Sequence, residues 1–223
     1  MSRNRAVREA DRTVPRFPVV GIGASAGGLE ALRNLFRGMP RDTGVAFVLV
    51  QPLDPPHQSL MADLLAKYAE IPVVQVTEGM RVECNRIHVI PPNTALTICG
   101  GVLHLSEPAA RRGMRMPIDQ FFISLAEDQQ ERSVAIVLSG TGTDGTSGVG
   151  MIKARGGMLI AHDPATAVYD GMPRSAIATG HVDYVLPAGR TSCVLPARSC
   201  AARLSRWKPP TKSSRPPMRS SCR

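Results

Sequence analysis

The stretch Phe17-Pro-Val-Val-Gly-Ile-Gly-Ala-Ser25-Ala-Gly-Gly28 decides the fold of this chain. It opens with an apolar run that is typical of a buried strand. Immediately downstream, over residues 29–36, apolar side chains recur at helical spacing. The segment therefore predicts a strand, a tight glycine turn and a helix, in that order.

Within the turn, Gly23-Ala-Ser25-Ala-Gly27 fits the G-x-S-x-G pattern of a nucleophile elbow. A serine on a sharp strand-to-helix turn presents its hydroxyl above the sheet, and side chains at the flanking positions would clash. The helix behind it points free N–H groups at the place where an oxyanion would form. The pattern thus predicts Ser25 as a nucleophile.

Two other interpretations compete with the elbow. Gly21-x-Gly23-x-x-Ala26 also fits the dinucleotide-binding fingerprint, and a glycine turn can simply close a strand–helix unit. A dinucleotide site requires an acidic residue about 20 positions further on, at the end of the second strand. The expected second strand, residues 45–50, is followed by Gln51, which disfavours a dinucleotide-binding Rossmann domain.

The order of the predicted elements favours an α/β fold. Apolar strands alternate with amphipathic helices, which implies a doubly wound, mainly parallel sheet in a three-layer, Rossmann-like arrangement. Short strands with Asn and Gly turns between Arg81 and Leu105 predict an antiparallel hairpin insertion. The other strands are expected at residues 17–20, 45–50, 72–76, 133–138, 158–161 and 182–186.

Composition divides the 223 residues into three parts. Residues 1–16 form a flexible basic lead without the apolar segment of a signal peptide, and residues 17–188 form one domain. Residues 189–223 are expected to be a disordered basic tail, because residues 190–223 hold nine of the 27 Lys and Arg residues and no Asp or Glu. Two origins of the tail stay open: a segment that meets anionic lipid or acidic partners, or an out-of-frame translation.

The remaining composition limits the function classes. Residues 1–189 hold 18 basic and 18 acidic residues without a basic, aromatic-interleaved face, so no nucleic-acid partner is expected. No apolar run approaches the about 18 residues of a transmembrane segment. The five cysteines lack a C-x-x-C pair, which predicts neither a disulfide framework nor a metal site and favours a reducing cytoplasm.

A serine nucleophile needs a base and a group that orients the base. In a doubly wound sheet these groups are expected on the loops at the carboxyl ends of the strands, since those loops converge. Three such loops carry Ser25, His57 and Asp144. His57 could equally be an exposed loop residue and Asp144 a turn-forming residue between glycines, so both alternatives stay open.

Six motifs follow one another along the chain: Gly21-Ile-Gly-Ala-Ser-Ala-Gly-Gly28, Val50-Gln51, Ile90-Pro-Pro-Asn93, Pro117-Ile-Asp-Gln-Phe-Phe122, Leu138-Ser-Gly-Thr-Gly-Thr-Asp-Gly145 and Tyr169-Asp-Gly-Met-Pro-Arg174. Together they resemble the catalytic domain of CheB-type chemotaxis protein-glutamate methylesterases over about residues 17–187. The resemblance is greatest to the branch that is often fused to CheR-type methyltransferases.

The resemblance implies the following roles: Ser25 as nucleophile, Asp144 as orienting carboxylate, Ala26 and Thr141 as oxyanion-hole positions, and Met172 and Arg174 on a substrate loop. The family reaction removes methyl groups from methylglutamates on chemoreceptor helices and releases methanol. Some members also deamidate glutamine at these sites. The implied partners are methyl-accepting chemotaxis receptors and a CheR-type methyltransferase, and no metal or organic cofactor is implied.

One departure from the family pattern bears on activity. The family's catalytic histidine follows the glutamine after the second strand, where this chain has Pro52. Proline has no titratable group and cannot accept the serine proton. His57, five residues further on, is only a weak substitute. The sequence therefore leaves two functions open: a serine methylesterase with impaired activity, or a non-catalytic module that binds receptor helices through the retained pocket.

Overall fold

The computed structural model describes residues 15, 17–51, 61–108 and 116–195. The predictions for residues 1–14, for Pro52 and His57, and for residues 196–223 lie outside the described residues.

The centre of the fold is a seven-stranded sheet in which all neighbouring strands run parallel, in the order β10-β9-β8-β1-β2-β5-β3. Its strands are β1 (Val19–Gly23), β2 (Ala46–Val50), β3 (Val73–Gln75), β5 (Ile87–Val89), β8 (Ser133–Val137), β9 (Met158–His162) and β10 (Tyr184–Leu186). A second, antiparallel sheet contains β4 (Met80–Arg81), β7 (Val102–Ser106) and β6 (Ala95–Cys99).

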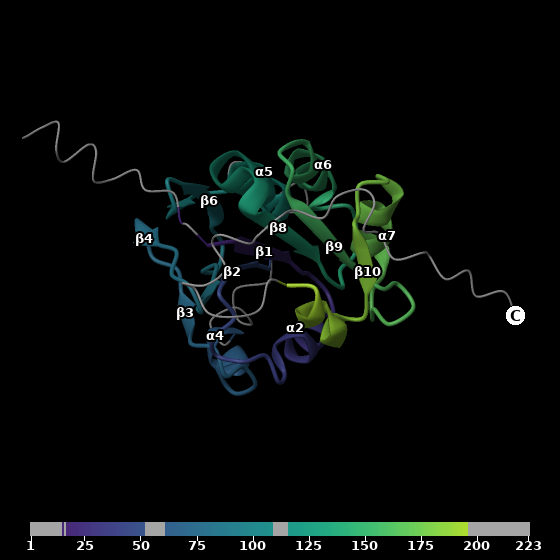
Figure 1. The fold of residues 1–223 in the computed structure, drawn as a ribbon, viewed down its shortest axis with the longest axis horizontal. Coiled ribbons are helices and arrows are strands. Elements are labelled where there is room, and N and C mark those ends of the chain that lie inside the picture. The colour runs from purple at the N-terminus through teal and green to yellow at the C-terminus, as the bar shows by residue number, and fades with distance from the viewer. Residues whose placement is uncertain (1–14, 16, 52–60, 109–115, 196–223) are drawn as a thin grey trace, which may run out of the picture.

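Helices cover both faces of the large sheet (Figure 1). One face carries α2 (Gly28–Phe36), α4 (Met61–Ala66) and the 3₁₀ helix η2 (Ala188–Cys193). The other face carries α5 (Pro117–Gln129), α6 (Thr146–Ala154) and α7 (Gly171–Ala178), with the 3₁₀ turn η1 (Gln130–Arg132) after α5. Alternate side chains of the strands enter the two cores. The prediction of a doubly wound, three-layer α/β fold with an antiparallel insertion is confirmed.

The extent of the insertion differs from the prediction. The sequence places residues 81–105 in one antiparallel unit, whereas residues 87–89 form β5 of the parallel sheet, between β2 and β3. A three-residue strand is too short to reveal by periodicity whether one face or both are buried. Here all three are buried, and the His88 ring is satisfied internally, with Nδ1 3.0 Å from the Phe47 carbonyl oxygen and Nε2 accepting the Glu83 N–H at 3.3 Å.

The ordered chain also continues beyond the expected domain end at residue 188. Residues 188–193 form η2, which packs against α2, and Leu195 joins the same buried core. Residues 188–193, whose composition resembles that of a polar tail, therefore pack over part of the apolar face of α2.

The order of the strands explains where a site can form. After β1 the chain builds β2, β3 and β5 on one side of it, and then β8, β9 and β10 on the other. Open parallel sheets bind ligands outside the carboxyl ends of the strands at such a change of direction. The loop after β1, residues 24–27, and the loop after β8, residues 138–145, meet at this edge.

The glycines of β1 allow α5 to approach the sheet closely. A Cβ on Gly21 would lie 2.8 Å from Leu125 Cδ2, and a Cβ on Gly23 would lie 2.5 Å from Ile118 Cγ2. Gly27 has φ +69°, in the left-handed region, and a Cβ there would lie 2.9 Å from Ser139 Oγ. The prediction that side chains flanking Ser25 would clash is confirmed.

We expect Gly23→Ala to lower the free energy of unfolding by about 1–3 kcal/mol, because the new methyl group displaces the buried Ile118 side chain. Gly150→Ala is the matched control, since a Cβ at this α6 position meets no atom within 4 Å. There we expect no loss, or a gain of about 0.5–1 kcal/mol. Urea unfolding followed by circular dichroism measures both. Equal stability of the two variants would contradict close packing of α5 on β1.

Candidate active site

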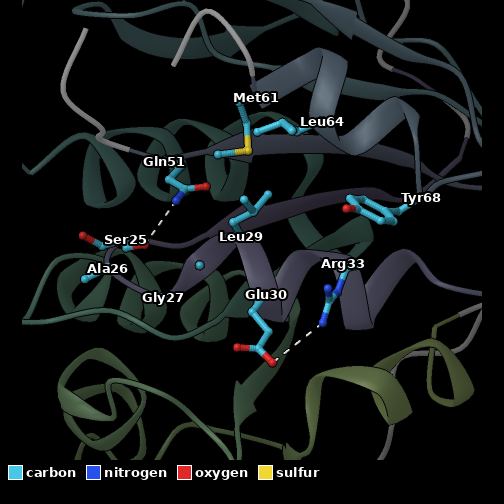
Figure 2. A pocket seen from close by; sticks show the side chains of 11 residues that line it. Ser25, Ala26, Gly27, Leu29, Glu30, Arg33, Gln51, Met61, Leu64 and Tyr68 are labelled. Carbon is cyan, nitrogen blue, oxygen red and sulfur yellow. Dashed lines mark hydrogen bonds and ion pairs between the residues drawn. The ribbon is translucent and has the colours of Figure 1, made fainter. Parts of the chain in front are cut away.

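The backbone of Ser25 is held by both neighbours of β1. The Ser25 N–H donates to the Ser139 carbonyl at 3.0 Å. The Ser25 carbonyl accepts the Gly28 N–H at 2.9 Å and Gln51 Nε2 at 3.1 Å (Figure 2). Gln51 follows β2 and Ser139 comes two residues after β8, so the sheet itself fixes the turn and leaves the partly exposed serine side chain at the carboxyl edge.

A buried hydroxyl joins this turn to two other loops. Ser139 Oγ accepts the Tyr169 N–H at 2.9 Å and lies 3.1 Å from the carbonyl oxygens of both Ala26 and Tyr169. The Ser139 residue is inaccessible to solvent. Because a hydroxyl has one hydrogen, it donates to one of these carbonyls at a time. Ser139 thereby connects the peptide after the predicted nucleophile with the loop that follows β9.

The glycine loop after β8 packs between Ser25 and Met172. The Gly140 N–H donates to the Tyr169 carbonyl at 3.0 Å, and the Gly140 carbonyl accepts the Met172 N–H at 2.9 Å. A Cβ on Gly140 would overlap Met172 Sδ and lie 2.9 Å from Ser25 Cβ. The structure therefore brings together Ser25, Met172 and the loop that carries the exposed Thr141.

Asp144 lies in the same glycine loop and caps α5. Its Oδ2 accepts the Ile118 N–H at 3.2 Å and its Oδ1 accepts the Asp119 N–H at 3.0 Å. Burial disfavours the ionised carboxylate and raises the pKa of Asp144 from 3.8 to about 6, against the lowering effect of these N–H donors. The Asp144 side chain thus binds the amino end of α5 in addition to lying in the glycine loop.

A second carboxylate returns this contact. Asp119 on α5 accepts the Gly148 N–H, in the first turn of α6, at 2.7 Å. Burial raises the pKa of Asp119 as well, because it leaves the charged form poorly solvated. Each helix therefore receives a carboxylate at its amino end, where the helix dipole favours negative charge.

A cavity of about 610 Å³ lies beside the Ser25 turn, between α2 and α4 (Figure 2). Ser25 and Gln51 border one end, and Arg33 and Tyr68 border the other. The wall between the two ends is largely apolar and is formed by Leu29, Met61 and Leu64. The cavity can accept an apolar group next to whatever reacts at Ser25.

The structure does not complete the predicted constellation. Pro52 and His57 lie outside the described residues, and within the described ranges no hydrogen bond joins the Ser25 hydroxyl to a histidine or a carboxylate. Arg174 is exposed, and its Nε donates at 2.5 Å to Oδ2 of Asp170, the residue directly before α7. The base and the function of the substrate loop stay predictions.

Three of the described histidines outside the candidate site, His88, His104 and His162, have partners for their rings. His104 Nδ1 lies 2.9 Å from Glu78 Oε1 on the antiparallel sheet. His162 is buried at the end of β9, with Nε2 3.1 Å from Thr166 Oγ1, and burial lowers the pKa of His162. These contacts give His88, His104 and His162 roles in the packing of the fold.

Among the described cysteines, Cys99 and Cys193 are free thiols. Over the described ranges, no three His, Cys, Asp or Glu side chains gather closely enough to hold a metal ion. None of the helices described there has the length and apolar character needed to cross a membrane.

Three residues contribute to the site in ways that the sequence did not reveal: Gln51, Ser139 and Asp119. A signal existed for the first two, because a polar residue directly after a buried strand lies at the carboxyl edge of the sheet. Asp119 had no such signal, since its partner is the first turn of a helix that begins 27 positions further along.

Comparison with known proteins gives a consistent result. The family model described as CheB methylesterase matches residues 20–193. The protein-glutamate methylesterase/protein-glutamine glutaminase of Pyrococcus abyssi is 35% identical over 81% of this chain and 51% of its own length. The protein-glutamate methylesterase/protein-glutamine glutaminase 3 of Burkholderia orbicola is 36% identical over 81% of this chain and 53% of its own length.

The solved structures add a close match in fold. The crystal structure of the Thermotoga maritima CheB methylesterase catalytic domain superimposes with a TM-score of 0.74 at 30% identity, covering 80% of this chain and 97% of that one. An uncharacterized 104.1 kDa protein of Rhodobacter capsulatus is 51% identical over 56% of this chain and 13% of its own length. The chain thus spans about half the length of the Pyrococcus and Burkholderia relatives, at 51% and 53%.

We expect Ser139→Ala to lower the free energy of unfolding by about 1–3 kcal/mol, because the Tyr169 N–H loses its acceptor. Ser175→Ala is the control: its hydroxyl reaches the Gly142 carbonyl only at 3.4 Å, and we expect a change within about 0.5 kcal/mol. Chemical denaturation measures both. An equally small effect of Ser139→Ala would show that the three loops hold together without this hydroxyl.

We expect the stability difference between the wild type and Asp144→Asn to shift toward the wild type as the pH falls. A carboxyl with a folded-state pKa of about 6 retains a proton that the unfolded chain releases above pH 3.8. Its contribution is full below pH 3.8 and is lost as the pH rises through 6. Between pH 7 and pH 4.5 the expected shift is about 2 kcal/mol by urea unfolding. A pH-independent difference would mean that the pKa of Asp144 is not raised.

Proposed function

The chain belongs to the CheB methylesterase family, and from this membership we propose that it hydrolyses glutamyl methyl esters on methyl-accepting chemotaxis receptors. The observation that carries the proposal is the Ser25 turn, which is held from both neighbouring strands beside the glycine loop of β8. The names of the relatives also include glutaminase, which supports deamidation of glutamine at the same site.

In the proposed reaction, Ser25 Oγ attacks the ester carbonyl carbon while a base takes the serine proton. Backbone N–H groups of Ala26 and Thr141 donate to the oxyanion that forms. Collapse of this intermediate expels methanol, and water then hydrolyses the acyl-enzyme to give the carboxylate and free Ser25. The contacts of the Ser25 carbonyl with the Gly28 N–H and with Gln51 Nε2 support this assignment, because this carbonyl and the Ala26 N–H belong to one planar peptide unit, which is thereby oriented before any substrate arrives.

Asp144 is the proposed orienting carboxylate for the base. Two backbone N–H donors favour its ionised form while burial opposes ionisation, so its charge is sensitive to its surroundings. The family's base position holds Pro52. We therefore propose that turnover is slowed by several orders of magnitude, with oxyanion stabilisation left in place and His57 acting at most as a weak substitute.

A second function has one specific feature in its favour. Pro52 stands at the family's base position while the cavity between α2 and α4 is present, so the chain would serve as a non-catalytic module that binds receptor helices. In either case the proposed partners are chemoreceptors and a CheR-type methyltransferase, and the proposed compartment is the cytoplasm, where the modified part of such receptors lies.

We expect Pro52→His to raise methanol release from a methylated receptor fragment by at least about 100-fold, because a positioned general base contributes roughly 10²–10⁴ in rate. Adding Ser25→Ala to that variant should abolish the gain. Methanol release that persists in the double variant would exclude Ser25 as the nucleophile. Substantial release by the natural chain that is lost in His57→Ala would instead identify His57 as the base.

A further inference from the structure

We propose that the cavity between α2 and α4 is a subsite for the polypeptide that carries the ester, and that Arg33 selects a carboxylate on that polypeptide. This inference rests on the proposed function, because it takes an ester bound at Ser25 as its starting point. It adds a substrate preference to that function: an apolar side chain next to the ester, followed by an acidic one.

The Arg33 guanidinium has unused hydrogen-bonding capacity. Its nearest acidic group, Glu30 Oε1, lies 3.8 Å from Nη2, beyond hydrogen-bond distance. Nε is buried and has no acceptor among the described residues. A guanidinium offers five N–H donors in a planar fork that matches a carboxylate. The side chain as a whole is 38% exposed, so its terminal Nη groups can donate to a carboxylate supplied by a ligand.

The position of Arg33 is set by its neighbours. Its guanidinium carbon lies 5.9 Å from the centroid of the Tyr68 ring, which keeps the positive charge at the end of the cavity away from Ser25 (Figure 2). The Glu30 partner is more than half exposed, and exposed ion pairs of this kind are weak. A substrate carboxylate can therefore compete with Glu30 for the guanidinium.

The spacing within the cavity defines the occupant. Arg33 lies five residues beyond Gly28, the first residue of α2, or about 7.5 Å along the helix axis. Leu29, Met61 and Leu64 line the space in between. A helical substrate would reach this span with side chains one to two turns from the ester, on the same face. The carboxylate then meets Arg33, and an apolar side chain covers the wall.

The test measures binding of two helical peptides that each carry one glutamate methyl ester. In one peptide the residues at the four- and seven-residue spacings on either side of the ester are glutamate, and in the other they are glutamine. The full chain with Ser25→Ala, which stops turnover, is expected to bind the glutamate peptide about 10-fold more tightly. Adding Arg33→Gln should bring the ratio of the two affinities to about 1, and Arg33→Lys should give an intermediate ratio.

Arg86→Gln is the matched control. Arg86 pairs with Glu83 at the same i,i+3 spacing and with similar side-chain exposure, 36% against 38% for Arg33, but does not line the cavity. The affinity ratio should stay unchanged in this variant. Leu64→Ala should weaken both peptides by the same factor, since it removes only apolar contact. A ratio that survives Arg33→Gln, or the absence of binding by either peptide, would overturn the subsite.

Failure of the subsite can be told apart from failure of the proposed function. Methanol release from the same peptides is measured separately with the Pro52→His variant. Methanol release that requires Ser25 but is the same with and without Arg33→Gln would support the esterase function and exclude the subsite. A charge preference that depends on Arg33, without any methanol release, supports the subsite and removes the esterase function.

Discussion

The hydrogen bond from the Ser25 N–H to the Ser139 carbonyl is the contact on which the rest of the site depends. It continues the pairing of β1 with β8 beyond the last paired residues, because the Leu138 N–H donates to the Gly23 carbonyl at 2.8 Å just before it. On the other side, the Ala24 N–H donates to the Val50 carbonyl at 3.2 Å. The Ser25 turn is therefore an extension of the sheet rather than a free loop. A serine held in this way loses little conformational entropy when a substrate binds, and the donors next to it keep their direction.

The close packing of α5 on β1 sets the electrostatics around Asp144. Because β1 contains glycines, α5 packs closely against the sheet. The amino end of α5 therefore lies against the glycine loop after β8. Asp144 then satisfies N–H groups of α5 that have no partner within the helix, while Asp119 does the same for α6. Burial raises the pKa of each carboxyl, and the charge of Asp119 adds to the rise in the pKa of Asp144. A residue that would hold a base in place is thus also a structural cap, and substitutions there change stability and chemistry together.

The parts of the fold that the sequence predicts are those with a local signature. Fully buried strands appear as apolar runs, and the Ser25 turn is marked by glycines that a Cβ would disturb. β5 was not predicted because three residues carry too little periodicity, and η2 was not predicted because it forms through packing against α2 rather than through its own composition. Within the site, Ser25, Ser139 and Asp144 could be placed at strand ends, but the contact of Ser139 with Ala26 could not be predicted, since the two residues lie 113 positions apart. Contacts of that kind depend on the assembled sheet and leave no trace in the local pattern.

Binding and proton transfer are carried by different elements of this fold. The proposed oxyanion donors and the cavity come from the turn after β1, the loop after β8, and the helices α2 and α4. The family's base position comes from the loop that follows β2, where this chain has Pro52. Removing a base lowers the rate of proton transfer but leaves in place the residues that line the cavity, Arg33 and the apolar wall among them. Affinity and turnover can therefore separate completely in such a chain, and the rate of ester cleavage, not the strength of binding, distinguishes an esterase from a receptor-binding module.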